Sequence, residues 1–130
     1  MQYYLILLIF ITIGCNPPGN KTEHPAEITK IALEKYQDHF NFLQNKDTLY
    51  VICFRQDSET ALNPTPPLRF FVFDVKNKKI IFEDNLPNGS VKWIDKYKIG
   101  VKTIPGIIRK DEILPEYTYV YDVLLKKKLK

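Results

Sequence analysis

Few residues of this chain combine a reactive side chain with a spacing that catalysis could use. Asp38 precedes His39, and a carboxylate beside an imidazole can orient a general base. Both fall in a segment with helical periodicity, where adjacent side chains point about 100° apart and do not face each other. Asp57 and Glu59 place two carboxylates in a polar loop, where charges are ordinarily solvated. The sequence therefore predicts a protein without enzyme activity.

The histidines and cysteines lack the spacing of metal ligands. His24 and His39 fall near opposite ends of a predicted helix, and Cys53 stands alone in the apolar run 49–54. A cysteine in such a run is ordinarily a core residue rather than a reactive thiol. The sequence has no glycine-rich phosphate loop, so we expect neither a metal nor a cofactor.

The N-terminus is an apolar run that ends at a cysteine. Residues 5–13 are apolar except for Thr12, and Gly14 and Cys15 follow. As a helix, residues 3–13 would reach roughly 16 Å, about half of a ~30 Å hydrocarbon core, which is too short to span a bilayer. This length fits the apolar core of a signal peptide. The alternative is a buried N-terminal strand with an ordinary core cysteine.

The segment Thr12-Ile13-Gly14-Cys15 resembles the lipobox of a bacterial lipoprotein signal peptide, with Thr12 in place of the more usual Leu. The resemblance implies cleavage before Cys15, a diacylglycerol thioether on its sulfur, and usually an acylated new N-terminus. It also implies that the lipid on Cys15 anchors the protein to a membrane of the bacterial cell envelope, on the periplasmic or surface side.

The chain carries a formal net charge of +4. Lys126, Lys127, Lys128 and Lys130 account for four positive charges, so the rest of the chain sums to zero. A nucleic-acid-binding domain would carry a basic stripe across its fold, so we expect no nucleic acid partner. The expected segments are a signal peptide at 1–14, the lipidated cysteine and a flexible tether at 15–23, a single globular domain at 24–125, and a basic tail at 126–130, which can attract anionic lipid headgroups weakly.

The domain is predicted to begin with an amphipathic helix. Pro25 suits the first helical position and Glu27 the third, where a carboxylate favours the helix N-terminus. Apolar residues then recur at helical spacing, namely Ile28, Ile31, Ala32, Tyr36, Phe40 and Leu43. The pattern predicts a helix that ends near residues 44–45, with Ile31 and Phe40 buried against a sheet.

After residue 45 the apolar residues alternate, which indicates strands at 48–55, 68–75, 79–84, 90–95, 97–104 and 117–125. Short turns between the middle strands make them antiparallel neighbours. We expect an α+β fold in which one N-terminal amphipathic helix packs on a curved, mostly antiparallel meander sheet of five to six strands. The connection 105–116 contains four aliphatic residues, which predicts that it folds back onto the body.

Two segments echo each other, because FVFDVKNKK at 71–79 matches YVYDVLLKK at 119–127, 48 residues later. The pattern is typical of a strand that enters a hairpin turn, and the interval lies in the range of β-propeller blades. A propeller needs about four or more blades, and the predicted strands amount to little more than one. The sequence therefore favours two strands with the same kind of hairpin over a repeat.

The predicted strands 48–55, 68–75 and 117–125 are apolar on both faces. One helix covers only one face of a sheet, so curvature of the sheet, the 105–116 connection or a partner must close the second. We expect some of four aromatic residues to stay partly exposed and close together, and to bind a partner: Tyr50, Phe54, Tyr119 and Tyr121. Tyrosine suits this role because its ring can be buried while its hydroxyl stays wet.

These features predict a lipid-anchored cell-envelope protein that is a non-enzymatic binding or structural module, with an envelope protein as its expected kind of partner. The alternative is an inhibitor or immunity-type protein that acts on an envelope enzyme or toxin. A flat aromatic patch would favour the first function. A projecting Pro-rich or acidic loop, such as the segment 56–67, would favour the second.

Overall fold

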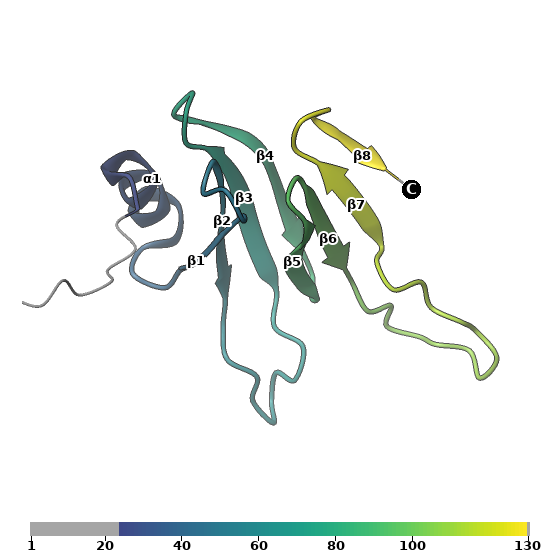
Figure 1. Cartoon of the computed structure of the whole chain (residues 1–130). Coiled ribbons are helices and arrows are strands. Elements are labelled where there is room, and N and C mark those ends of the chain that lie inside the picture. The colour runs from purple at the N-terminus through teal and green to yellow at the C-terminus, as the bar shows by residue number, and fades with distance from the viewer. Residues whose placement is uncertain (1–23, 130) are drawn as a thin grey trace, which may run out of the picture.

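The structure is a computed structural model that describes residues 24–129. These residues form one helix and eight strands, namely α1 (Ala26–Tyr36), β1 (Asn41–Gln44), β2 (Tyr50–Gln56), β3 (Leu68–Asp74), β4 (Lys79–Leu86), β5 (Ser90–Asp95), β6 (Lys98–Lys102), β7 (Tyr119–Asp122) and β8 (Lys127–Leu129). The strands make two antiparallel sheets, a first sheet in the order β1-β2-β3-β4 and a second in the order β5-β6-β7-β8 (Figure 1). The predicted signal peptide and tether lie outside the described residues.

The predicted α+β class is confirmed, but the prediction of one meander sheet with five to six strands is wrong. The described residues form two sheets of four strands each. One unpredicted strand is β1, which lies where the sequence predicts the second half of the helix. The other is β8, which pairs with β7 and extends the fold into the segment 126–130 that the sequence analysis assigns to a basic tail.

The helix α1 ends at Tyr36 rather than near residue 44. Gln37 takes a left-handed conformation with φ of 60°, and its backbone N–H donates to the Leu33 carbonyl at 3.0 Å, which closes the last turn. In β1, Phe42 packs in the cluster under α1, whereas Leu43 packs in the cluster between the sheets. The helical spacing of Tyr36, Phe40 and Leu43 is therefore not the face of one longer helix. It arises because a helix is followed by a strand that packs on both faces.

The molecule has three layers, namely α1, the first sheet and the second sheet (Figure 1). On one face of the first sheet, α1 residues Ile28, Ala32 and Tyr36 pack with Val51, Cys53, Phe71 and Phe73. Ile31 and Phe40 are partly buried in this cluster, Phe40 from the connection after α1. The opposite face packs against the second sheet through residues that include Ile52, Phe70, Val72, Ile99 and Val101. A second sheet therefore covers the face that the sequence analysis assigned to curvature, to the 105–116 connection or to a partner.

The two sheets repeat each other at an interval of 48 residues. At the end of the third strand of each sheet, an aspartate pairs in register with a lysine, Asp74 with Lys79 and Asp122 with Lys127. The backbone N–H of Val75 donates to the Leu49 carbonyl at 3.0 Å, and the matching pair, Val123 and Tyr97, has the same distance. The echo between 71–79 and 119–127 therefore belongs to a structural repeat, which corrects the preference for two separate hairpins.

The connections gather at two opposite ends of the sheets (Figure 1). The turn end comprises the four hairpin turns with their flanking residues, 45–49, 75–79, 95–98 and 123–128. The loop end comprises the loops 57–67 and 103–118 and the short connection 87–89. The prediction that 105–116 folds back onto the body is wrong, because this connection projects and leaves Ile107 and Ile113 86% and 95% exposed.

Candidate functional site

The four aromatic residues predicted to bind a partner all pack against the core cluster that joins the two sheets. Tyr50, Phe54 and Tyr119 are partly buried there, and Tyr121 is buried with 4% of its surface exposed. The structure thus brings all four to the layer between the sheets. The aromatic rings next to the three tyrosines belong to other residues, Tyr97 beside Tyr50 and Phe82 beside the other two.

Both tyrosines of β7 contact β4 of the first sheet. Tyr121 stacks on Phe82 with 4.0 Å between ring centroids, and its hydroxyl donates to the Ile81 carbonyl at 3.4 Å. Tyr119 donates to Oδ2 of Asp84 at 2.6 Å. Burial, together with this hydrogen bond, raises the pKa of Tyr119, so the hydroxyl remains a donor. These contacts hold the two sheets together, which gives both rings a role in packing.

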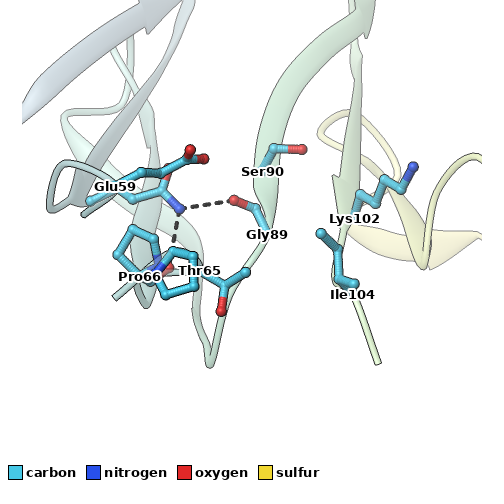
Figure 2. Close-up of a pocket in the computed structure, with 9 residues that line it drawn as sticks. Glu59, Thr65, Pro66, Gly89, Ser90, Lys102 and Ile104 are labelled. Carbon is cyan, nitrogen blue, oxygen red and sulfur yellow. Dashed lines mark hydrogen bonds between the residues drawn. The ribbon is translucent and has the colours of Figure 1, made fainter. Parts of the chain in front are cut away.

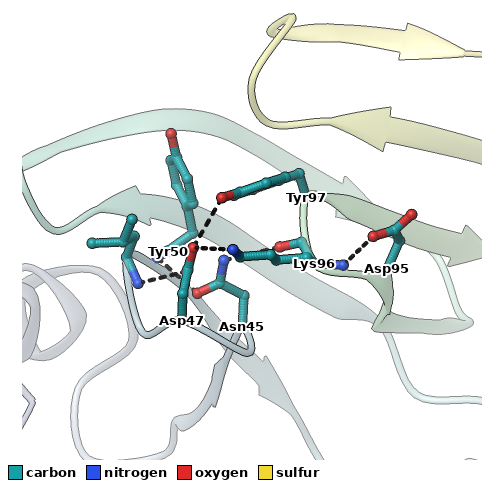
Figure 3. Close-up of polar contacts among 7 residues, drawn as sticks. Asn45, Asp47, Tyr50, Asp95, Lys96 and Tyr97 are labelled. Atoms are coloured by element: carbon teal, nitrogen blue, oxygen red, sulfur yellow. Dashed lines mark hydrogen bonds and ion pairs between the residues drawn. The ribbon is translucent and has the colours of Figure 1, made fainter.

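A polar network at the turn end also joins the sheets (Figure 3). Tyr97 donates to Oδ2 of Asp47 at 3.0 Å, and Nζ of Lys96 lies 3.5 Å from the same oxygen. Asn45 donates to the Lys96 carbonyl at 2.9 Å and accepts from the Tyr50 backbone N–H at 3.1 Å. Desolvation alone would raise the pKa of Asp47, but hydrogen bonds from a backbone N–H and from Tyr97 lower it. The carboxylate is therefore an ionised partner within the fold.

Asp38 and His39 form a close pair, with 2.7 Å between Oδ1 and Nδ1. The expectation that they do not face each other is wrong, because α1 ends at Tyr36 and helical geometry does not separate them. The two side chains are 80% and 70% exposed, so solvent surrounds the pair.

Cys53 is a core residue, as predicted, with none of its surface exposed. Burial raises the pKa of its thiol to about 12, so the group stays protonated at neutral pH. Within residues 24–129, no three His, Cys, Asp or Glu side chains cluster as metal ligands would.

A hollow of about 210 Å³ lies at the loop end, between the 57–67 loop and the second sheet (Figure 2). Gln56 donates from Nε2 to the carbonyls of Pro66 at 3.2 Å and Gly89 at 2.9 Å, which ties the loop to the 87–89 connection. Gly89 has φ of 120°, and a Cβ there would lie 1.9 Å from the Lys102 carbonyl oxygen. Glu59 and Lys102 give the wall one charge of each sign. The hollow can therefore accept a small polar group.

Two loops beside this hollow expose large aliphatic side chains. Leu62 is 99% exposed at the tip of a turn in which the backbone N–H groups of Thr60 and Asn63 donate to each other's carbonyls, at 3.0 and 3.1 Å. Ile107 and Ile113 are displayed by the second loop. Leu62 is absent from the residues predicted from the sequence, although a large aliphatic side chain in a loop that is otherwise polar and rich in proline was a signal for it.

The roots of the two loops are fixed relative to each other. Pro64 of the first loop and Ile104 of the second line the same hollow. The second loop is closed at its base by Thr103, whose backbone N–H donates to Oγ1 of Thr118 at 2.8 Å. We call the hollow with Leu62, Ile107 and Ile113 the loop-end surface. It combines exposed apolar side chains on two loops with a polar recess between the loop roots.

Comparison of the chain with known protein families, curated proteins and solved structures finds no match. In the described part of the chain, no helix has the length and apolar character needed to cross a membrane.

Proposed function

We propose that this chain is a lipid-anchored cell-envelope protein that works without catalysis, by binding a partner protein through its loop-end surface. The observation that supports the binding function is the exposure of Leu62. Its side chain is 99% exposed, on a turn that is closed by backbone hydrogen bonds between Thr60 and Asn63. A large apolar side chain held in water costs solvation free energy, and burial against a partner would recover it. Ile107 and Ile113 offer further apolar area on the neighbouring loop.

The lipid anchor rests on the sequence around Cys15, where an apolar run ends at a small residue and a cysteine. A diacylglycerol and a further acyl chain together would hold the protein stably, whereas a single chain binds membranes only marginally. The test is mass spectrometry of the mature N-terminus, which should begin at a diacylated or triacylated Cys15. Retention of residues 1–14, or an unmodified Cys15, would overturn the anchor.

The binding function is tested by pull-down from detergent-solubilised envelopes. We expect Leu62→Ser/Ile107→Ser/Ile113→Ser to lose a partner that the wild type captures, with an unchanged melting temperature because the three side chains make little contact with the fold. Leu33→Ser/Leu49→Ser/Ile94→Ser is a matched control, since these side chains are 38–50% exposed away from the loop end. Equal capture by the loop-end variant and the wild type would contradict the proposal.

A second candidate function, inhibition of an envelope enzyme or toxin, is favoured by the shape of the 57–67 loop. This loop contains Pro64, Pro66 and Pro67 and projects from the first sheet (Figure 1). Leu62 lies between Thr60 and Asn63, which close its turn, and is 99% exposed. Such a loop fits a cleft better than a flat surface. Photo-crosslinking from position 62 distinguishes the two functions, because crosslinks that map to the partner's active-site cleft favour inhibition and crosslinks elsewhere favour simple binding.

A further inference from the structure

The charges of the molecule are divided between its two ends. The turn end contains nine lysines and two acidic residues in its four segments, Asp47 and Asp95, and two further aspartates, Asp74 and Asp122, border these segments. The loops of the loop end contain five acidic residues, Asp57, Glu59, Asp111, Glu112 and Glu116, against the basic residues Arg109 and Lys110, with Lys102 and Arg55 bordering them. The net charge of +4 therefore conceals a positive end and a negative end of the same domain.

The lysines of the turn end are concentrated on the two hairpins that the repeat relates. The β3–β4 hairpin carries Lys76, Lys78 and Lys79, and the β7–β8 hairpin carries Lys126, Lys127 and Lys128. The two hairpins are close enough to interact electrostatically. Burial alone would raise the pKa of Asp74, but hydrogen bonds from Asn77 and the charge of Lys126 on the other hairpin lower it.

The β7–β8 hairpin also exposes two leucines. Leu124 and Leu125 lie in its turn with 56% and 60% of their surfaces exposed, next to three consecutive lysines. Asp122 holds this turn, because its Oδ1 accepts hydrogen bonds from the backbone N–H groups of both leucines at 2.9 Å. Adjacent lysines and exposed leucines are the combination that favours the interface of an anionic bilayer.

The described chain begins beside β1, the strand that leads into the β1–β2 turn. His24 lies on β1, with 4.2 Å between its ring centroid and that of Phe42, and 3.2 Å from its Nδ1 to Nε2 of Gln44, the last residue before the β1–β2 turn. In the first turn of α1, Glu27 pairs with Lys78 of the β3–β4 hairpin at 3.3 Å. The segment 16–23 can span at most roughly 28 Å when fully extended, which is long enough for a lipid on Cys15 to lie at the turn end.

We propose that the turn end rests on anionic phospholipid headgroups, with its lysines on the phosphates and Leu124 and Leu125 at the interface, so that the loop end faces away from the membrane. The inference rests on the proposed lipid anchor at Cys15 and adds an orientation to it. Each lysine held near an anionic surface strengthens membrane attachment, and the acidic loop end is repelled from the same surface. The orientation presents the loop-end surface to partners.

The test uses the mature lipidated protein on phosphatidylcholine vesicles with and without phosphatidylglycerol. A polarity-sensitive dye is attached to Leu125→Cys or, as the control, to Leu62→Cys at the loop end. The label goes to the introduced thiol, because Cys53 is buried and the sulfur of Cys15 would be in a thioether. We expect a blue shift of the dye at position 125 only with phosphatidylglycerol, its reversal at high salt, and no shift at position 62.

Charge reversal supplies the matched variants. Lys76→Glu/Lys79→Glu/Lys127→Glu should abolish the shift at position 125, and these exposed lysines make no ion pair or side-chain hydrogen bond with the residues that the structure describes. Lys92→Glu/Arg109→Glu/Lys110→Glu makes the same charge change away from the turn end and should preserve the shift. Melting temperatures equal to that of the wild type show that both variants fold.

The outcomes separate the orientation from the anchor. Protein that does not float with either vesicle overturns the anchor. Protein that floats with both vesicles but shows no shift at position 125, an equal shift without phosphatidylglycerol, or a shift at position 62 overturns the orientation alone. Loss of the shift in the Lys92/Arg109/Lys110 variant as well would show general charge attraction, which also overturns it.

Discussion

The indole N–H of Trp93 donates to the carbonyl of Leu43 at 2.9 Å, from one sheet to the other. Trp93 belongs to β5 and Leu43 to β1, which are the first strands of the two sheets and lie at their edges. The bond between Asn45 and the Lys96 carbonyl continues this connection into the turn end. The two sheets are therefore joined by directed hydrogen bonds as well as by apolar packing, which fixes how they stack.

Trp93→Phe should lower the free energy of unfolding by about 1–2 kcal/mol, because it removes the N–H donor while keeping an aromatic ring in the cluster between the sheets. Urea denaturation measures the change. Ser90→Ala is the control, since Ser90 is an exposed residue of the same strand, and its effect should stay within about 0.5 kcal/mol. A Trp93→Phe variant as stable as the wild type would show that the hydrogen bond does not hold the sheets together.

Gly89→Ala should destabilise the domain by at least about 2 kcal/mol. Its φ of 120° is strained for any residue with a Cβ, and that Cβ would lie 1.9 Å from a backbone oxygen of Lys102. Gly106→Ala is the matched control, because nothing lies within 4 Å of a Cβ at that position. Similar thermal denaturation midpoints for the two variants would contradict the close approach of the 87–89 connection to β6.

The sequence predicted most of the sheet residues but not their division into two sheets. A continuous apolar run placed β3 and alternation placed β5, both almost to the residue. The connection 87–89 looks the same in sequence whether the next strand extends the sheet or begins a second one. β8 was missed because Lys127 and Lys128, as exposed edge residues, give no apolar alternation.

The candidate site was predicted less well than the fold, for a related reason. Strands that are apolar on both faces indicated that a second layer must cover the sheet, and Tyr119 and Tyr121 were predicted to bind a partner protein there. The second sheet, which contains these same tyrosines, is that cover. The apolar pattern of a strand shows which of its faces must be buried. It does not show whether another part of the same chain or a partner protein covers that face. Leu62 and Ile113 follow no periodic pattern, so periodicity could not show that their side chains are exposed.

The thiol of Cys53 should make the stability of the domain decrease in alkali. Burial raises its pKa from 9.0 to about 12, so the unfolded chain releases this proton at a lower pH than the folded chain does. The stabilisation is fully present below pH 9 and is lost as the pH rises toward 12, with a slope of up to about 1.4 kcal/mol per pH unit.

Urea denaturation under reducing conditions at several pH values measures this slope. Cys53→Ala leaves a small cavity that lowers stability by a similar amount at every pH, but it removes the titrating group. The wild type should therefore lose stability faster than Cys53→Ala between pH 9 and 10, because the tyrosines titrate in both proteins and only the thiol differs. Parallel pH profiles for the two proteins would show that the thiol is accessible rather than buried.

Substitution of the two β7 tyrosines decides between packing and partner binding for the aromatic residues. Tyr121→Ser removes a buried ring stacked at 4.0 Å on Phe82 and should lower the free energy of unfolding by about 3–5 kcal/mol, a large part of the stability of a domain of this size. Tyr119→Phe removes only the hydroxyl that donates to Asp84 at 2.6 Å and should cost about 1–2 kcal/mol. Thermal and urea denaturation measure both changes, and pull-down with Tyr119→Phe, which keeps the ring, should still capture the partner. If Tyr121→Ser instead retains the wild-type melting temperature and loses the partner, the ring belongs to a binding surface and the two sheets separate to expose it.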